Sequence, residues 1–199
     1  MSTRNDFNPT LIAAEEPQAC IGLLELGSVA RGIEVADAVL WEAQVELLFA
    51  TPVQPGKYAL LFSGSVQDVS ASLRRGAELA AGDLVDQLHI PQLHEQIIPA
   101  LGRRGGHING ELDALGIIET TSIASAIVAA DIALKTATVD LFDLRIANGL
   151  GGRSFLALTG EVSDVRSAVV AGARSASESG HLAREVVIPR PHVDLSRHL

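Results

Sequence analysis

The first half of this sequence is repeated in the second half, and the repeat limits the possible fold more than any other feature. The segment Gly22–Leu48 (GLLELGSVARGIEVADAVLWEAQVELL) aligns with Gly116–Leu141 (GIIETTSIASAIVAADIALKTATVDL). After a short insertion in the second copy, the match continues as far as Ile90-Pro91 against Ile188-Pro189. Identity at so many positions that are separated by nearly the same number of residues in the two copies indicates a tandem duplication. The 199 residues are therefore expected to form two domains of one fold.

Each copy predicts the same helix at its start. Ser28 and Ser122 are both placed to cap a helix by accepting a hydrogen bond from a free backbone N–H. Apolar residues then recur at spacings of three and four, which predicts the inner face of each helix. These are Val29, Ile33, Ala36 and Leu40 in the first copy, and Ile123, Ile127, Ala130, Leu134 and Ala137 in the second.

The remaining pattern completes a β-α-β-β-α-β unit. Apolar runs predict strands in the first copy at Cys20–Leu26, Val45–Ala50, Lys57–Ser63 and Leu84–Ile90, with a second helix within Gly64–Gly82. Prolines and a glycine predict a loop over Thr51–Gly56. The second copy repeats this order, with its loop at Ile146–Gly152 and its last strand at Leu182–Ile188. The predicted class is α+β: two ferredoxin-like domains, each a four-stranded sheet with helices on one side.

Composition suggests an acidic protein that associates with itself. The net charge of −9 and pI near 5.0 argue against nucleic-acid binding, which needs a basic face. The single cysteine, Cys20, excludes a disulfide within one chain. Apolar runs are too short for a membrane span, and no signal peptide is recognisable, so a cytoplasmic protein is expected. A mean hydropathy of +0.27 predicts buried subunit interfaces.

The domain boundaries follow from where the repeat stops. Residues 1–19 are polar, contain Pro9 and Pro17, and are expected to form a flexible N-terminal arm. The first domain then covers residues 20–101 and the second covers 115–199. The glycine-rich, charged stretch GRRGGHING suggests a linker over residues 102–114.

Several ordered motifs, each present in related form in both copies, carry a family resemblance. In the second copy they are ETTSIASAIVAADIALKTATVDL, LTGEVSDVRSAVVAGA and VIPRPH; in the first they are GLLELGSVARGIEVADAVL, QPGK and IPQLH. Together they resemble bacterial microcompartment shell domains in unpermuted order. Two such domains in one chain make it similar to the tandem-domain, trimer-forming shell proteins, and the resemblance covers Cys20–Leu199 apart from the linker.

This resemblance implies a structural role without catalysis. It implies a homotrimer that forms a pseudo-hexagonal tile, which packs edge to edge with other tiles in a microcompartment shell within the cytoplasm. The implied partners are other copies of the chain, hexameric and pentameric shell proteins, encapsulated enzymes, and small polar metabolites that cross a central pore. Neither nucleic acid nor a membrane is implied as a partner.

The resemblance also implies residues at the tile edge. The family carries a lysine on the first helix, matched by Lys135, and an arginine in the motif I-P-R-P-H, matched by Arg190, with His192 beside Arg190. The alternative is that Lys135 and Arg190 are ordinary solvated charges. The first copy has Trp41 and Gln92 at these positions, so its edges differ chemically. Trp41 is either an apolar edge contact, since tryptophan is favoured in interfaces, or a half-buried packing residue.

The loops between the second and third strands line the pore in this family. Here they comprise Gln54, Pro55 and Gly56 from the first copy and Asn148, Gly149, Leu150 and Gly151 from the second. Read without the family, they are two ordinary hairpin turns. Some relatives hold an iron–sulfur cluster through a cysteine at the position of Gln54. Because amides are poor ligands for such a cluster, no cofactor and no metal are expected.

Enzyme interpretations find little support in the residues. His94 and His192 occupy equivalent positions after the last strand and are interpreted as structural. The repeated pairs Glu25/Glu119 and Asp37/Asp131 suggest capping or interface hydrogen bonds. A rival from another class is a soluble ligand-binding regulator, because duplicated ferredoxin-like domains also serve as sensors. Concentrated shell tiles would form sheets or tubes, whereas a sensor would stay discrete.

Overall fold

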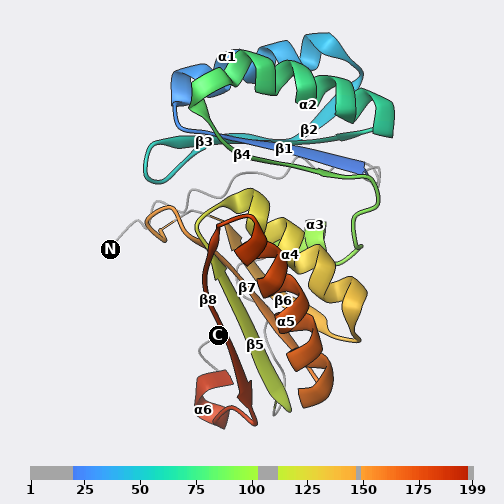
Figure 1. Ribbon diagram of the computed structural model, residues 1–199, viewed down its shortest axis with the longest axis vertical. Coiled ribbons are helices and arrows are strands. Elements are labelled where there is room, and N and C mark those ends of the chain that lie inside the picture. Colours follow the sequence, from blue (N-terminus) through green and yellow to red (C-terminus); the bar gives the residue numbers. More distant parts are fainter. Residues whose placement is uncertain (1–19, 103–111, 147–148, 197–199) are drawn as a thin grey trace, which may run out of the picture.

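A computed structural model describes residues 20–102, 112–146 and 149–196, and shows two domains with the same topology (Figure 1). The arm at residues 1–19 and most of the expected linker lie outside the described residues. The first domain contains β1 (Cys20–Leu26), α1 (Val29–Glu42), β2 (Val45–Val53), β3 (Lys57–Gly64), α2 (Val66–Ala80), a single 3-10 turn (Ala81–Asp83), β4 (Leu84–Ile90) and α3 (Ile97–Gly102). The second contains β5 (Ala114–Thr120), α4 (Ile123–Thr136), β6 (Asp140–Ile146), β7 (Ser154–Gly160), α5 (Val162–Glu178), β8 (Leu182–Pro189) and α6 (Val193–Ser196).

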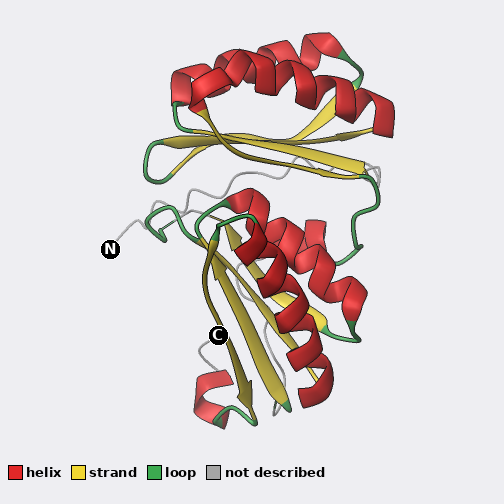
Figure 2. Cartoon of the chain, in the orientation of Figure 1, coloured by secondary structure: helices red, strands yellow, loops and turns green. Residues whose placement is uncertain are grey.

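Each domain is an antiparallel four-stranded sheet with two helices on one face (Figure 2). The strand orders are β2-β3-β1-β4 and β6-β7-β5-β8. The predicted β-α-β-β-α-β unit is therefore confirmed in both copies. We call these sheets the first and second sheet, and the side that a sheet's own two helices leave uncovered its outer face.

The predicted helix caps are present. The Ser28 hydroxyl oxygen accepts a hydrogen bond from Arg31 N at 3.3 Å, and that of Ser122 accepts one from Ser125 N at 3.0 Å. Each serine thus satisfies one of the free N–H groups at a helix start.

The loop predicted over Thr51–Gly56 is shorter than expected. β2 continues through Pro52 to Val53, and only Gln54–Gly56 form the turn. Proline lacks a backbone N–H but is tolerated in an edge strand, and β2 is the edge of its sheet. The proline was therefore a misleading sign of strand termination.

The predicted inner face of α1 is wrong for two of its residues. Ile33 and Leu40 are 58% and 46% exposed. The residues that α1 buries are Gly32, Val35, Ala36 and Val39. A Cβ on Gly32 would lie 2.3 Å from Tyr58 Cγ, so the small side of the helix faces its own sheet at close range. The larger aliphatic stripe of α1 points outward.

The corresponding stripe of α4 is buried, because the outer face of the first sheet covers it (Figure 1). Ile127 and Leu134, the repeat counterparts of Ile33 and Leu40, are 0% and 7% exposed. One continuous hydrophobic cluster joins Leu23 and Leu88 of the first sheet to these residues of α4. Thus α4 packs on two sheets, its own and that of the first domain. We call the second of these contacts the interdomain interface.

Candidate functional site

A buried carboxylate connects the two domains at the start of α4. The Glu25 Oε2 atom accepts a hydrogen bond from Ile123 N at 2.8 Å, and Oε1 pairs with Lys57 Nζ at 2.9 Å. The Glu25 side chain is 0% exposed. A carboxylate is favoured at a helix N-terminus, where unpaired N–H groups carry partial positive charge. The interpretation of Glu25 as an interface hydrogen-bond acceptor is confirmed.

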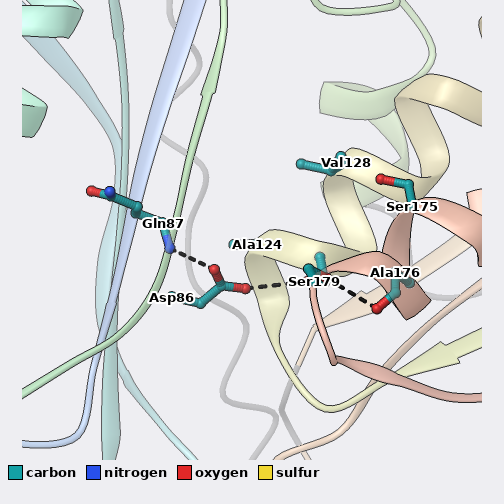
Figure 3. A pocket seen from close by; sticks show the side chains of 8 residues that line it. Asp86, Gln87, Ala124, Val128, Ser175, Ala176 and Ser179 are labelled. Carbon is teal, nitrogen blue, oxygen red and sulfur yellow. Dashed lines mark hydrogen bonds between the residues drawn. The ribbon is translucent and has the colours of Figure 1, made fainter.

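A second carboxylate of the first domain, Asp86 on β4, also points toward the start of α4 (Figure 3). It accepts hydrogen bonds from the hydroxyls of Ser122 and, at 3.2 Å, Ser125. Its Oδ2 lies 3.7 Å from His181 Nε2. A shallow pocket between the domains is lined there by Asp86, Gln87, Ala124, Ser125, Val128, Ser175, Ala176 and Ser179. Asp86 therefore makes several polar contacts of the interdomain interface near the start of α4.

At the far end of α4, the predicted edge lysine lies on the junction between domains. Lys135 Nζ donates to Asp131 Oδ2 at 2.6 Å and to the carbonyl oxygen of Gln92. Asp131 Oδ1 accepts from His94 N at 2.9 Å, which confirms its interpretation as an interface acceptor. The Lys135 side chain remains 43% exposed. An ammonium has three N–H donors, so two contacts within the chain leave one donor for a further partner.

The two predicted structural histidines have equivalent local roles. His94 Nδ1 accepts a hydrogen bond from Gln96 N at 3.4 Å, and His192 Nδ1 accepts one from Asp194 N at 3.2 Å. Both rings therefore accept the same local hydrogen bond in the segment that follows the last strand of a domain. Arg190, just before His192, is exposed at a backbone φ of 47°, and its N–H bonds the carbonyl of Asp113 at 2.7 Å.

Among the described residues, Trp41 is the most exposed large apolar side chain. It lies at the end of α1 and is 83% exposed. The alternative of a half-buried packing residue is therefore wrong for the single chain. Together with Ile33 and Leu40 it makes the outer side of α1 a large aliphatic and aromatic surface, as expected for an interface.

The loops predicted to line a pore lie beside each other. A Cβ on Gly152 would be 2.7 Å from Pro55 Cδ and 3.5 Å from the carbonyl oxygen of Gln54. Gly149, Gly151 and Gly152 have φ values of 75°, 61° and 88°, which residues other than glycine rarely adopt. The turn after β6 thus meets the turn after β2, although Asn148 lies outside the described residues. Figure 1 shows both turns at the same side of the molecule.

Three of these contacts were not predicted from the sequence. The Gly152–Pro55 contact depends on how the domains pack, and only the glycine-rich turn hinted at it. Asp86 has no identical partner in the repeat, so comparison of the two copies passed over it. The hydrogen bond between Glu25 and Ile123 joins distant segments, although the repeated glutamate was a visible signal.

The thiol of the single cysteine is buried in the first domain. Cys20 is 4% exposed, and burial raises the pKa of its thiol. Among the described residues, no three His, Cys, Asp or Glu side chains gather into a possible metal site. No helix in the described part of the chain is long and apolar enough to cross a membrane.

Known proteins resemble this chain over nearly its full length. The family model described as BMC domain matches residues 20–93 and again residues 114–191. The bacterial microcompartment shell protein PduT of Citrobacter freundii is 41% identical over 179 residues, covering 90% of this chain and 96% of PduT. The carboxysome assembly protein CcmO of Synechocystis is 26% identical over 193 residues, covering 91% of this chain and 64% of CcmO.

Solved structures agree with these relatives. The crystal structure of a microcompartments protein from Desulfitobacterium hafniense DCB is 50% identical, with a TM-score of 0.77, covering 89% of this chain and 98% of that one. The fused permuted hexameric shell protein MSM0275 is 22% identical with a TM-score of 0.59, covering 79% of this chain and 81% of that one, and supports the fold alone.

Proposed function

The chain belongs to the BMC-domain family of bacterial microcompartment shell proteins, and from this premise we propose that three copies close into a pseudo-hexagonal shell tile with a central pore. Its tandem domains and its relatives assign it a structural role in the shell rather than an enzymatic one. The trimer, the tile edges and the pore are the parts proposed here.

The observation that carries the proposal is that both surfaces of the interdomain interface have counterparts in the same chain that are exposed in part, although Leu115 and Phe142 on the second sheet's outer face are buried. The first sheet's outer face is occupied by α4, but the same stripe of α1 is exposed. On the receiving side, Leu88 of the first sheet is 4% exposed, while its counterpart Val186 on β8 is 39% exposed. Likewise Ile97 of α3 is 0% exposed and its counterpart Leu195 of α6 is 40% exposed.

Placing α1 of one copy on the second sheet of the next would repeat the interdomain interface between chains. Glu119 would then bond Val29 N of the adjacent copy, as Glu25 bonds Ile123 N. Asp37, which is exposed, would accept from His192 N of that copy, as Asp131 accepts from His94 N. Such a head-to-tail contact forms either a closed ring or an open filament. A ring of three copies alternates the two domains around an axis.

A measurement of native mass tests this ring. Closure predicts a single species at three times 20.9 kDa over a range of concentrations. A discrete monomer or dimer contradicts the proposal, and a broad series of masses indicates a filament. Electron microscopy of concentrated protein should then show sheets or tubes whose repeat is one tile.

The proposed edge and pore follow from where residues lie in each domain. The turns Gln54–Gly56 and Gly149–Gly152 lie beside the strand end at which α4 begins. Lys135 lies at the other end of α4, about 20 Å away at 1.5 Å per residue. A ring that turns the paired loops inward would direct Lys135, Arg190, His192 and Trp41 toward its rim. Small polar metabolites would pass the loops, and neighbouring hexameric and pentameric tiles would meet the rim.

The shell places the protein in the bacterial cytoplasm, around the enzymes that the shell encloses. This location rests on the relatives, which are microcompartment shell and carboxysome assembly proteins. Fractionation with intact microcompartments should recover the chain in the shell fraction. Recovery with the free soluble proteins alone would contradict the location.

A further inference from the structure

The two domains carry opposite charges at one matched position of the interface. Inside the chain, Asp86 of the first domain faces His181 of the second, with 3.7 Å between Oδ2 and Nε2. The repeat counterparts of this pair are Arg184 and Asp83. On the sheet, the first domain therefore carries an acid (Asp86) where the second carries a base (Arg184). At the facing position, the second domain carries His181 where the first carries the acid Asp83.

Backbone pairing establishes this equivalence independently of the side chains. Asp86 is the partner of Glu25 in the first sheet, and Arg184 is the partner of Glu119 in the second. Asp83 O accepts from Gly27 N at 2.8 Å, just as His181 O accepts from Thr121 N at 2.9 Å. Each residue thus occupies the same place in its domain as its counterpart.

We propose that Arg184 of one copy forms an ion pair with Asp83 of the adjacent copy, and that this charge-inverted pair specifies which domains meet. The inference rests on the head-to-tail ring proposed above. In that ring, β8 of one copy takes the place of β4, and Asp83 of the next copy takes the place of His181.

Both groups are accessible in the single chain. Arg184 is exposed, and the Asp83 side chain is 44% exposed. Asp83 already lies 3.5 Å from Arg31 Nε, and Arg31 also pairs with Glu34 at 2.5 Å. Arg184 would therefore enter a site with two carboxylates and one guanidinium, where the balance of charge favours it. A guanidinium also matches carboxylate geometry with two donors.

The inversion discriminates against wrong pairings. If the first domain of another copy entered the position of α4, Asp83 would face Asp86. If a second domain entered the position of α1, His181 would face Arg184 in place of the acid. The first of these wrong pairings places two carboxylates together, which is a common means by which an interface rejects a wrong partner, and the second removes the carboxylate with which Arg184 would pair. The alternation of domains around the ring is then specified by charge as well as by the apolar stripe.

A charge-exchange experiment tests the pair. Arg184→Asp and Asp83→Arg should each weaken the trimer about ten-fold in sedimentation equilibrium, within the range of coupling found for contacting residues. The double variant places the carboxylate at position 184 and the guanidinium at position 83, so that the two charges are again opposite, and should recover most of the wild-type association. Arg166→Asp makes the same charge change at an exposed site on α5 and should leave association near wild type.

Each outcome bears on one of the two proposals. A wild-type protein that is not a trimer contradicts the ring itself. A wild-type trimer whose single variants behave like Arg166→Asp, or whose double variant is no better than the singles, overturns the ion pair alone. Should a charge reversal impair folding, as judged by circular dichroism, the neutral variants Arg184→Gln and Asp83→Asn replace it. Their effects on association should be non-additive, and strict additivity would contradict the pair.

Discussion

The carboxylate of Glu25 holds the first turn of a helix that belongs to the other domain, because its Oε2 accepts the N–H of Ile123 at 2.8 Å. The same carboxylate pairs with Lys57 of its own sheet at 2.9 Å. Its repeat counterpart, Glu119, is 34% exposed and pairs with Arg153 at 2.8 Å. One glutamate is thus fully used inside the chain, while the other lies on a surface that the proposed ring would cover.

Replacing Glu25 should destabilise the chain far more than replacing Glu119. Glu25→Ala leaves Lys57 and the N–H of Ile123 without their buried acceptor, and loss of one partner of a buried ion pair costs roughly 3–5 kcal/mol. Glu119→Ala removes a half-exposed pair and should cost about 1 kcal/mol or less. Denaturant unfolding of dilute, dissociated protein measures both. Equal losses would show that Glu25 does not secure the interdomain interface.

A charge on the outer stripe of α1 should abolish assembly without unfolding the chain. Ile33→Asp places a carboxylate where the proposed ring buries an aliphatic side chain, and Ile33 is 58% exposed in the single chain. We expect a folded monomer in native mass measurement. Val170→Asp changes a residue that is 67% exposed on α5 and serves as the matched control. If Ile33→Asp remains trimeric, α1 does not enter the interface.

Removing the rim charges should leave the trimer intact but impair sheets. Lys135→Ala and Arg190→Ala delete donors that are exposed in the chain and that the proposed tile places at its edge. Sheet formation is scored by electron microscopy at equal trimer concentration. Changes at Trp41 and Gln92 should matter less, because they depart from the family pattern. Unchanged sheets in both charge variants would contradict the edge assignment.

The contact between the two turns should be more sensitive to a methyl group at Gly152 than at Gly149. Both glycines have positive φ, which costs another residue about 1–2 kcal/mol. Only Gly152→Ala would also place its Cβ 2.7 Å from Pro55 Cδ, whereas nothing lies within 4 Å of a Cβ on Gly149. The larger loss of thermal stability is therefore expected for Gly152→Ala. Equal losses would mean that the turns do not pack together.

Converting Gln54 to cysteine should create a cluster site if three copies of Gln54 converge. Gln54→Cys supplies the thiolates that iron–sulfur clusters require, and anaerobic reconstitution should yield a brown trimer with about one cluster per three chains. Native Cys20 is a suitable internal control, since burial raises the pKa of its thiol and slows its labelling. A colourless variant whose new thiol labels like an exposed cysteine would contradict the pore assignment.

The strands and caps could be predicted because their signals are local. β1 and β4 begin and end at the predicted residues, and Ser28 and Ser122 cap as expected. The stripe of α1 was misassigned because this helix has two apolar faces. The face on its own sheet is built from small residues such as Gly32 and Ala36, whereas Ile33 and Leu40 give the stronger signal. Periodicity finds the most hydrophobic side, whatever covers it.

The interface residues could be predicted only in part. The repeated Glu25 and Asp131 were visible as candidates, because identical residues at matched positions suggest a shared task. Asp86 and Arg184 were missed, since a search for identity between copies overlooks positions where the two domains differ in charge. The partner of each residue depends on how one domain sits on the other, which the spacing of residues along the chain does not encode.

The covalent connection between the first sheet and α4 changes how assembly depends on protein supply. Because both sides of the interdomain interface belong to one chain, it forms at an effective concentration set by the linker, independent of how much protein the cell holds. In the proposed ring every second interface is of this kind. The amount of complete ring then rises with the cube of the free chain concentration, whereas six separate domains would require the sixth power. In the proposed ring, the duplication therefore makes tile formation less sensitive to expression level and fixes the stoichiometry of the two domains at one to one.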